Sequence, residues 1–177
     1  MFGVVLAPHN DDETLFMAYT VMRNKPLVII ITDGYNQKRM GFEVNAEQRR
    51  LESIEACRIL GAPVVFLGIK DTEITEDILA ERLSGLSADI VYAPAIQGGH
   101  KDHDLVSRVA VRLFGDRVRH YSTYSKEDFF IQEGTKVVPI EAEMLLKNEA
   151  LNKYVSQIRY SKPHFDEVRG KPEWFIC

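Results

Sequence analysis

The stretch GVVLAPHNDDETLF, residues 3–16, contains a strand, a turn and the start of a helix, and it decides the fold that we expect. Its first five residues form a continuous apolar, β-branched run, as in a strand that is buried on both faces. Three consecutive acids, Asp11, Asp12 and Glu13, then open a segment with helical character. A strand that leads directly into a helix is the first half of a βαβ unit, which predicts a parallel sheet.

The same alternation of strand and helix patterns continues along the chain. Further strands are predicted at 26–32, 63–68 and 89–94. Helices are predicted at 12–23, 45–60, 75–84 and 103–114. This order predicts right-handed crossovers and an α/β fold, namely a Rossmann-like, doubly wound and mostly parallel sheet with helices on both faces.

The helix predicted at 45–60 has clear boundaries. Asn45 is a favourable N-cap residue, and Gly61 is typical of the position just after a helix. We expect its core-facing stripe to contain Leu51, Ile54 and Leu60.

Beyond residue 116 the pattern is weaker. Segments 117–124 and 135–140 are predicted as later strands, and 141–158 as a helix. The remaining segment, 159–177, is predicted to be irregular.

Length and composition indicate the class of protein and of partner. With 177 residues, 45% of them hydrophobic and 27% charged, the chain is expected to form a single domain spanning 1–177. A net charge of -4 gives no basic surplus, so we expect no nucleic-acid and no membrane partner, but a small-molecule substrate. The sequence has no secretory signal pattern and no apolar run of membrane-spanning length, which predicts a cytoplasmic protein. It leaves open whether the chain forms a homo-oligomer.

The cysteine content limits the kinds of site that can be built. Cys57 lies in a predicted helix, and Cys177 is 120 residues further along, at the C-terminal end of the sequence. The two cysteines therefore form neither a disulfide framework nor a closely spaced thiolate site. Any metal must therefore be held by His, Asp or Glu.

Polar clusters follow all four of the first predicted strands. They are PHNDDE (8–13), TDGYN (32–36), LGIKD (67–71) and QGGHKDHD (97–104). Because the carboxyl ends of parallel strands lie at one edge of a sheet, and ligands bind there, these clusters predict a functional site at that edge.

The residue types in two of these clusters favour a metal site. His9 and Asp12 are separated by a strand-to-helix turn, and HKDH supplies His100 and His103. Two histidines and one aspartate can bind zinc and leave a position open for water, while Asp11 remains available as a base. Acids that merely cap a helix, and surface histidines, are the simpler interpretation of each motif alone. Their occurrence at one sheet edge favours the metal site.

The motifs resemble those of a known family. APHNDDE is similar to the HPDDE signature, and HKDH to the HxDH signature, of the LmbE-like or PIG-L family of zinc-dependent de-N-acetylases. The resemblance extends to TDG (32–34), RRLESIEACRILG (49–61), ALNKYVSQ (150–157) and PEWF (172–175). One departure is Asn10, which stands where the signature has proline and leaves every chemically required side chain in place.

The resemblance implies a role for each residue of the two signatures. It implies that the zinc ligands are His9, Asp12 and His103. Asp11 would be the general base, His100 would polarise or protonate the tetrahedral intermediate, and Asp102 would orient His100.

The resemblance also implies an activity and a set of substrate contacts. Arg49 and Asp71 match positions that contact the sugar. Asp33 is expected either to help close the site or to form a turn with the glycine that follows it. The implied reaction is hydrolysis of an N-acetyl group on an amino sugar or small glycoconjugate, which releases acetate and a free amine. The implied cofactor is Zn²⁺, although the same donor set also suits divalent iron, cobalt or manganese.

The same fold class also includes non-catalytic binding domains and nucleotide-binding domains. A non-catalytic metal- or sugar-binding domain of the same fold would need neither Asp11 nor His100, yet both are present. A nucleotide-binding Rossmann domain would need a glycine-rich loop after the first strand, where this chain has acids that repel phosphate.

Overall fold

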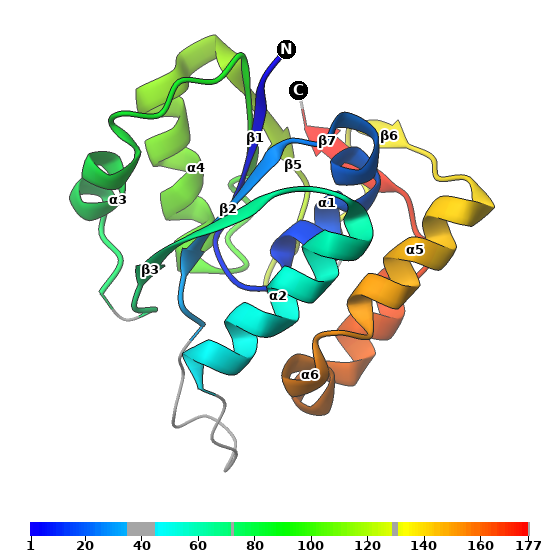
Figure 1. The fold of residues 1–177 in the computed structure, drawn as a ribbon. Coiled ribbons are helices and arrows are strands. Elements are labelled where there is room, and N and C mark those ends of the chain that lie inside the picture. Colours follow the sequence, from blue (N-terminus) through cyan, green and yellow to red (C-terminus); the bar gives the residue numbers. More distant parts are fainter. Residues whose placement is uncertain (35–44, 72, 129–130, 177) are drawn as a thin grey trace.

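The computed structural model describes residues 1–34, 45–71, 73–128 and 131–176, and these form one sheet covered by helices (Figure 1). Its strands are β1 (Gly3–Ala7), β2 (Leu27–Thr32), β3 (Val64–Ile69), β4 (Ile90–Pro94), β5 (Val118–Tyr121), β6 (Thr135–Val137) and β7 (Glu173–Ile176). Their order is β3-β2-β1-β4-β5-β7-β6. The neighbours from β3 to β5 pair in parallel, whereas β7 is antiparallel to both β5 and β6.

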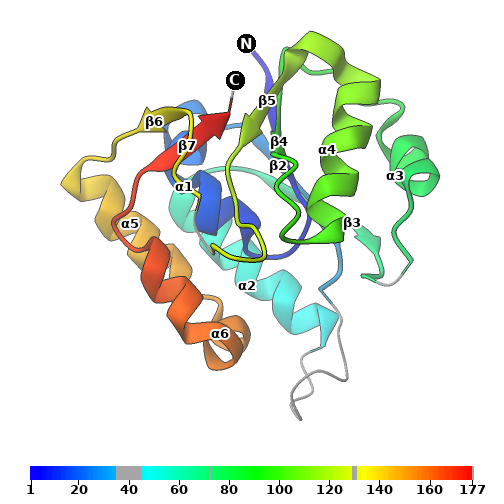
Figure 2. The ribbon, with the colours of Figure 1, turned by 180° about the vertical axis from the view of Figure 1, so that it is seen from behind.

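Helices cover both faces of this sheet (Figures 1 and 2). They are α1 (Asp12–Asn24), α2 (Ala46–Leu60), α3 (Glu76–Leu83), α4 (Lys101–Phe114), α5 (Glu141–Leu151) and α6 (Val155–Val168), with a 3-10 turn at Gly115–Arg117. None of them, within the residues that the structure describes, has the length and apolarity that crossing a membrane requires.

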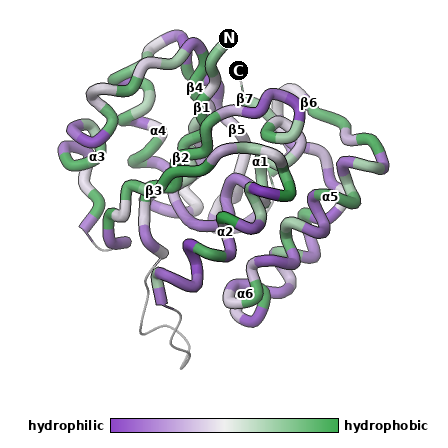
Figure 3. The backbone as a smooth tube through the Cα atoms, viewed as in Figure 1, coloured by the Kyte–Doolittle hydropathy of each residue, from purple (hydrophilic) through white to green (hydrophobic). Residues whose placement is uncertain are grey.

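The central strands contribute to two hydrophobic cores, one on each face. In β1, Val5 and Ala7 pack with residues of α1, α2, α5 and α6, while Val4 and Leu6 pack with residues of α3 and α4. This alternation explains why β1 and β2 are apolar along most of their length, as the hydropathy colouring of Figure 3 shows. The predicted doubly wound, mostly parallel α/β fold is confirmed.

Helix α2 has the predicted ends but a different buried face. Asn45 caps it by accepting a 2.7 Å hydrogen bond from the Gln48 amide, and Gly61 ends it with φ 71°. Leu51 and Ile54 are 53% and 37% exposed, so the predicted apolar stripe is wrong at these two positions. The buried residues are instead Arg49, Glu52, Ser53, Ala56, Cys57 and Leu60. Cys57 is a free thiol, whereas Cys177 lies outside the described residues.

The buried polar residues of α2 contact other elements. Glu52 accepts hydrogen bonds from the backbone amide of Ser156 at 2.9 Å and from its hydroxyl at 2.6 Å. Since Ser156 lies in the first turn of α6, Glu52 satisfies groups that the start of that helix leaves without intrahelical partners. The face of α2 is therefore selected by polar partners as well as by the core.

The C-terminal prediction needs correction. The predicted helix 141–158 is two helices, because α5 ends at Leu151 and α6 begins at Val155. The described part of segment 159–177 is mostly regular, since α6 continues to Val168 and β7 follows at Glu173–Ile176. Pro163 lies inside α6, near a kink at Ser161, and it obscures the helical pattern because proline lacks the amide that a helix interior needs.

Two buried charged residues attach this C-terminal part to α1. Lys147 of α5 donates a 2.8 Å hydrogen bond to the Leu15 carbonyl, and Glu173 of β7 accepts from the Tyr19 and Thr20 amides at 2.5 and 3.0 Å. Both side chains are at most 1% exposed. Burial lowers the pKa of the Lys147 ammonium from 10.5 to about 8, with the charge of Glu173 opposing the shift.

This shift predicts a pH-dependent stability that Lys147→Met removes. The folded protein releases the proton near pH 8 and the unfolded chain near pH 10.5, so the unfolded state binds more protons in between. The free energy of unfolding should therefore rise between pH 8 and pH 10 by about 2 kcal/mol more in the parent than in Lys147→Met. Urea unfolding at both pH values measures this difference. Equal pH profiles for the two proteins would contradict the shift.

Candidate metal centre and active site

The candidate site lies where two neighbouring strands end. β1 and β4 are adjacent and parallel, and the strand order reverses between them, because β2 lies beyond β1 and β5 beyond β4. Ligands bind to open α/β sheets at such a switch point. Helix α1 begins at Asp12 and α4 at Lys101, so the first turns of both helices come to this point.

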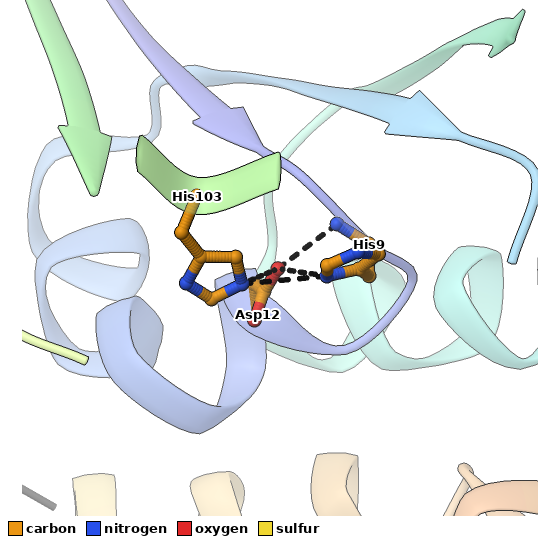
Figure 4. A group of neighbouring side chains, drawn as sticks. All are labelled: His9, Asp12 and His103. Carbon is orange, nitrogen blue, oxygen red and sulfur yellow. Dashed lines mark hydrogen bonds and ion pairs between the residues drawn. The ribbon is translucent and has the colours of Figure 1, made fainter. Parts of the chain in front are cut away.

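Three donor atoms meet there (Figure 4). Asp12 Oδ2 is 3.2 Å from His9 Nδ1 and 3.2 Å from His103 Nε2, and these two nitrogens are 3.3 Å apart. Zinc bonds of 2.0–2.1 Å in a tetrahedral site place neighbouring donor atoms about 3.3 Å apart. The three atoms therefore match one face of a tetrahedral metal site, and a set of two nitrogens and one oxygen suits zinc and similar divalent metals.

Two of these three side chains are buried, His9 is partly exposed, and all three are electrostatically coupled. Asp12 and His103 are 2% exposed. Burial opposes the charge of His9, but hydrogen bonds to Asp102 and Asp12 outweigh it and raise the pKa of His9 to about 10. Burial likewise opposes the charge of Asp12, but the charge and hydrogen bond of His103 hold its pKa far below the usual range. Negative and positive groups thus stabilise each other in this cluster.

Asp102 lies closer to His9 than to His100. Its Oδ2 is 3.3 Å from His9 Nε2 and 3.7 Å from His100 Nδ1. The carboxylate thus holds the ring nitrogen of His9 that points away from Asp12. In metal sites, such a partner fixes the orientation of the ligating imidazole.

His100 stands at the N-cap of α4 beside the three donors. Its Nδ1 accepts a 3.2 Å hydrogen bond from the Asp102 backbone amide, so a neutral His100 ring carries its proton on Nε2. Burial lowers the pKa of His100 from 6.5 to about 4. The side chain is 33% exposed, which leaves it accessible to a ligand. His100 is therefore placed as a neutral hydrogen-bond donor.

Asp11 lies next to the cluster in an unusual backbone conformation. Its φ of 147° is rare for a non-glycine residue, and its amide donates to the His9 carbonyl at 3.1 Å and to Glu13 Oε2 at 3.2 Å. Burial raises the pKa of Asp11 to about 8, although the Arg49 guanidinium opposes the shift. Glu13 itself is fully buried and accepts a hydrogen bond from the Tyr154 hydroxyl.

Arg49 joins the loops that follow β1 and β2. It is 8% exposed and donates to the Asn10 carbonyl at 2.5 Å, to Asp11 Oδ2 at 3.3 Å and to the Gly34 carbonyl at 3.4 Å. Asp71, after β3, accepts from the Gly34 amide at 3.0 Å. The structure thus brings Arg49 and Asp71 to the predicted edge, where the contacts described are with backbone groups and with Asp11.

A pocket of about 230 Å³ opens beside these residues. It is lined by Asn10, Thr32, Asp33, Ala46, Glu47, Arg50, Phe66 and Gly68. Asp33 is thus placed in a pocket wall, while Tyr35 and Asn36 of the TDGYN cluster lie outside the described residues.

Sequence reasoning missed the contribution of the segment after β5. The Tyr124 ring lies 5.1 Å from that of His103, and Thr123 Oγ1 is 3.3 Å from His103 Nδ1. The signal that could have found these residues is the point at which β5 ends. β5 stops at Tyr121, so the polar residues 122–124 form a further cluster at the same edge, whereas the sequence pattern extended this strand to 124.

Solved structures with this fold include proteins of different activity. The conserved protein TT1542 from Thermus thermophilus is 23% identical, with a TM-score of 0.78 over 100% of this chain and 94% of that one. N,N'-diacetylchitobiose deacetylase from Pyrococcus horikoshii is 20% identical, with a TM-score of 0.75 over 98% and 82%. The 4-carboxy-2-hydroxymuconate hydratase GalB from Pseudomonas putida is 16% identical, with a TM-score of 0.76 over 99% and 95%. At these identities the similarity shows the fold.

Sequence comparison is more specific. A search of curated proteins gives no match. The family model described as PIG-L, GlcNAc-PI de-N-acetylase, matches residues 4–114, which include β1 from its second residue, β4 and both signature motifs. Because this match spans more than half of the 177 residues, the chain belongs to the PIG-L family of de-N-acetylases.

Proposed function

We propose that this protein is a metal-dependent N-deacetylase that removes the acetyl group from an amino sugar or small glycoconjugate. The observation that carries the proposal is the triangle of His9 Nδ1, Asp12 Oδ2 and His103 Nε2 beside Asp11. Family membership and the chitobiose deacetylase with the same fold support the choice of an acetamido sugar as substrate. We further propose that residues 1–177 act as a single catalytic domain.

His9, Asp12 and His103 are the residues that would hold the metal, with Zn²⁺ as the expected ion. When bound, such a metal lowers the pKa of water and polarises the amide carbonyl. In this proposal Asp11 accepts a proton from the attacking water as the new carbon–oxygen bond forms. The same carboxyl group then gives the proton to the nitrogen as the carbon–nitrogen bond breaks, so that acetate and a free amine leave.

His100 has a separate role in this proposal. Its Nε2–H, fixed by the hydrogen bond that Nδ1 accepts from the Asp102 amide, donates to the carbonyl oxygen as negative charge develops there. Arg49 holds Asp11 by contacting both its carboxylate and the preceding carbonyl group. Arg49 is therefore proposed as a positioning residue for the base, in addition to the sugar contact that the family resemblance implies.

Metal content is the first test of the proposal. Protein loaded with zinc and then dialysed should retain about one ion per chain, and His103→Ala should lose most of it because one of three protein ligands is missing. His164→Ala, a change at an exposed histidine on α6, serves as the matched control and should retain the metal. Elemental analysis measures the ratio. A parent protein without metal, or His103→Ala with the full amount, would contradict the proposed centre.

Catalysis is tested by changing the base while keeping the metal ligands. Asp11→Asn should retain the zinc but release acetate about 100- to 10,000-fold more slowly, since the amide cannot accept the proton. Acetate is measured with N-acetylglucosamine and N,N'-diacetylchitobiose as substrates. Asp77→Asn, which changes an exposed acid in the first turn of α3 that has no role in the proposal, is the matched control.

The outcome separates the enzyme from the alternative, a non-catalytic binding domain. Acetate release that is undiminished in Asp11→Asn rules out Asp11 as the base. A parent that binds both the metal and the sugars, yet releases no acetate, favours the binding domain.

Arg49→Met tests how the arginine acts. If it positions Asp11, kcat should fall roughly 10- to 100-fold while KM stays near the parent value, because misplacing a catalytic group slows the chemical step. Arg58→Met, which changes an exposed arginine on the same helix, should have parent kinetics. A raised KM with unchanged kcat would assign Arg49 to sugar binding alone.

A further inference from the structure

The second nitrogen of His103 is held by two side chains, Thr123 and Gln97, that lie outside the two signature motifs. His103 Nδ1, on the ring side opposite Asp12, is 3.3 Å from Thr123 Oγ1. Thr123 Oγ1 in turn is 3.2 Å from Gln97 Oε1. Thr123 is 1% exposed, so water does not replace these contacts easily.

The direction of every hydrogen bond in this chain follows from its outer members. The Thr123 backbone amide, which can only donate, lies 2.7 Å from Gln97 Oε1 and identifies that atom as the oxygen of the amide group. At the other end, Gln97 Nε2 donates to Ser122 Oγ at 2.9 Å, while the Ser122 hydroxyl donates to the Ile131 carbonyl. The amide of Gln97 thus has one orientation that satisfies all of its neighbours.

This orientation determines the proton position on His103. Since Gln97 Oε1 can only accept, the Thr123 hydroxyl donates to it and keeps its lone pairs for the imidazole. His103 Nδ1 must then be the protonated nitrogen, and the Nε2 lone pair faces Asp12 and His9. The ring is held in the form that a metal requires.

We propose that Thr123 and Gln97 are positioning residues of the metal centre, which select Nε2 of His103 as its metal-binding atom. The inference rests on the proposed metal site. Asp102 acts in a corresponding way on His9, but it selects the other ring nitrogen. Its carboxylate holds His9 Nε2, which leaves His9 Nδ1 to face Asp12 Oδ2 and His103 Nε2. His9 is thus oriented by the carboxylate of Asp102, and His103 by the uncharged side chains of Thr123 and Gln97. None of these three orienting residues is one of the proposed metal ligands.

Removal of the Thr123 hydroxyl should weaken metal binding. In Thr123→Val the metal-bound ring would carry an unpaired, buried N–H, so zinc affinity should fall about 10- to 100-fold. Thr123→Ser keeps the hydroxyl and should bind zinc almost as the parent does. Gln97→Leu frees the Thr123 hydroxyl to rotate and should cause a smaller loss than Thr123→Val. Competition with a chromophoric chelator measures these affinities.

Thr20→Val is the matched control. Its hydroxyl is also buried, but it donates to Glu173 at 2.8 Å and lies outside the metal cluster. This variant should lose stability without losing zinc affinity, which separates an effect on the metal from a general loss of packing.

A second measurement does not depend on any variant folding. In the ¹⁵N-labelled, zinc-loaded parent, His103 should show its proton on Nδ1 and coordination through Nε2 by NMR. Coordination through Nδ1, or parent affinity in Thr123→Val, would overturn this inference and leave the proposed deacetylase in place. Zinc binding with the expected losses, but without acetate release, would support the inference and contradict the proposed activity. A parent that binds no zinc would overturn both.

Discussion

The structure depends on one electrostatic constraint: several ionisable side chains are buried together after β1, and each needs a partner. An uncompensated buried charge is strongly destabilising, so the surrounding elements must supply opposite charges or hydrogen-bond donors. Asp12 has two imidazoles, Asp11 has Arg49, and Glu13 has the Tyr154 hydroxyl. This requirement explains why the buried face of α2 contains polar residues such as Arg49, while Leu51 and Ile54 lie on its exposed face.

The sequence predicts the first four strands, α1 to α4 and the edge at which the site lies, because buried parallel strands and their polar ends leave strong local patterns. It predicts α6 and β7 poorly. Pro163 interrupts the helical pattern, and β7 is a four-residue antiparallel strand whose place depends on distant contacts. For the site, residue types indicate which side chains gather, but the closer approach of Asp102 to His9 and the backbone contacts of Arg49 depend on loop geometry.

The donor atoms of the metal triangle and some of the groups that support them come from different parts of the chain. The region matched by the family model, 4–114, contains all three donors of the metal triangle. The later region contributes supporting groups to that site, namely Thr123 next to His103 and Tyr154 next to Glu13. These supports are single hydroxyl groups in loops or at helix starts, which explains why motif comparison detects the donors more easily than the groups that hold them.

The contact between Glu173 and α1 has a consequence for the order of folding during synthesis. Tyr19 and Thr20 are made 153 to 154 residues before the carboxylate that accepts their amide hydrogens. Such long-range contacts form late, since a large loop must close first. Helix α1, which carries Asp12, therefore lacks the carboxylate partner of its Tyr19 and Thr20 amides until residue 173 has left the ribosome.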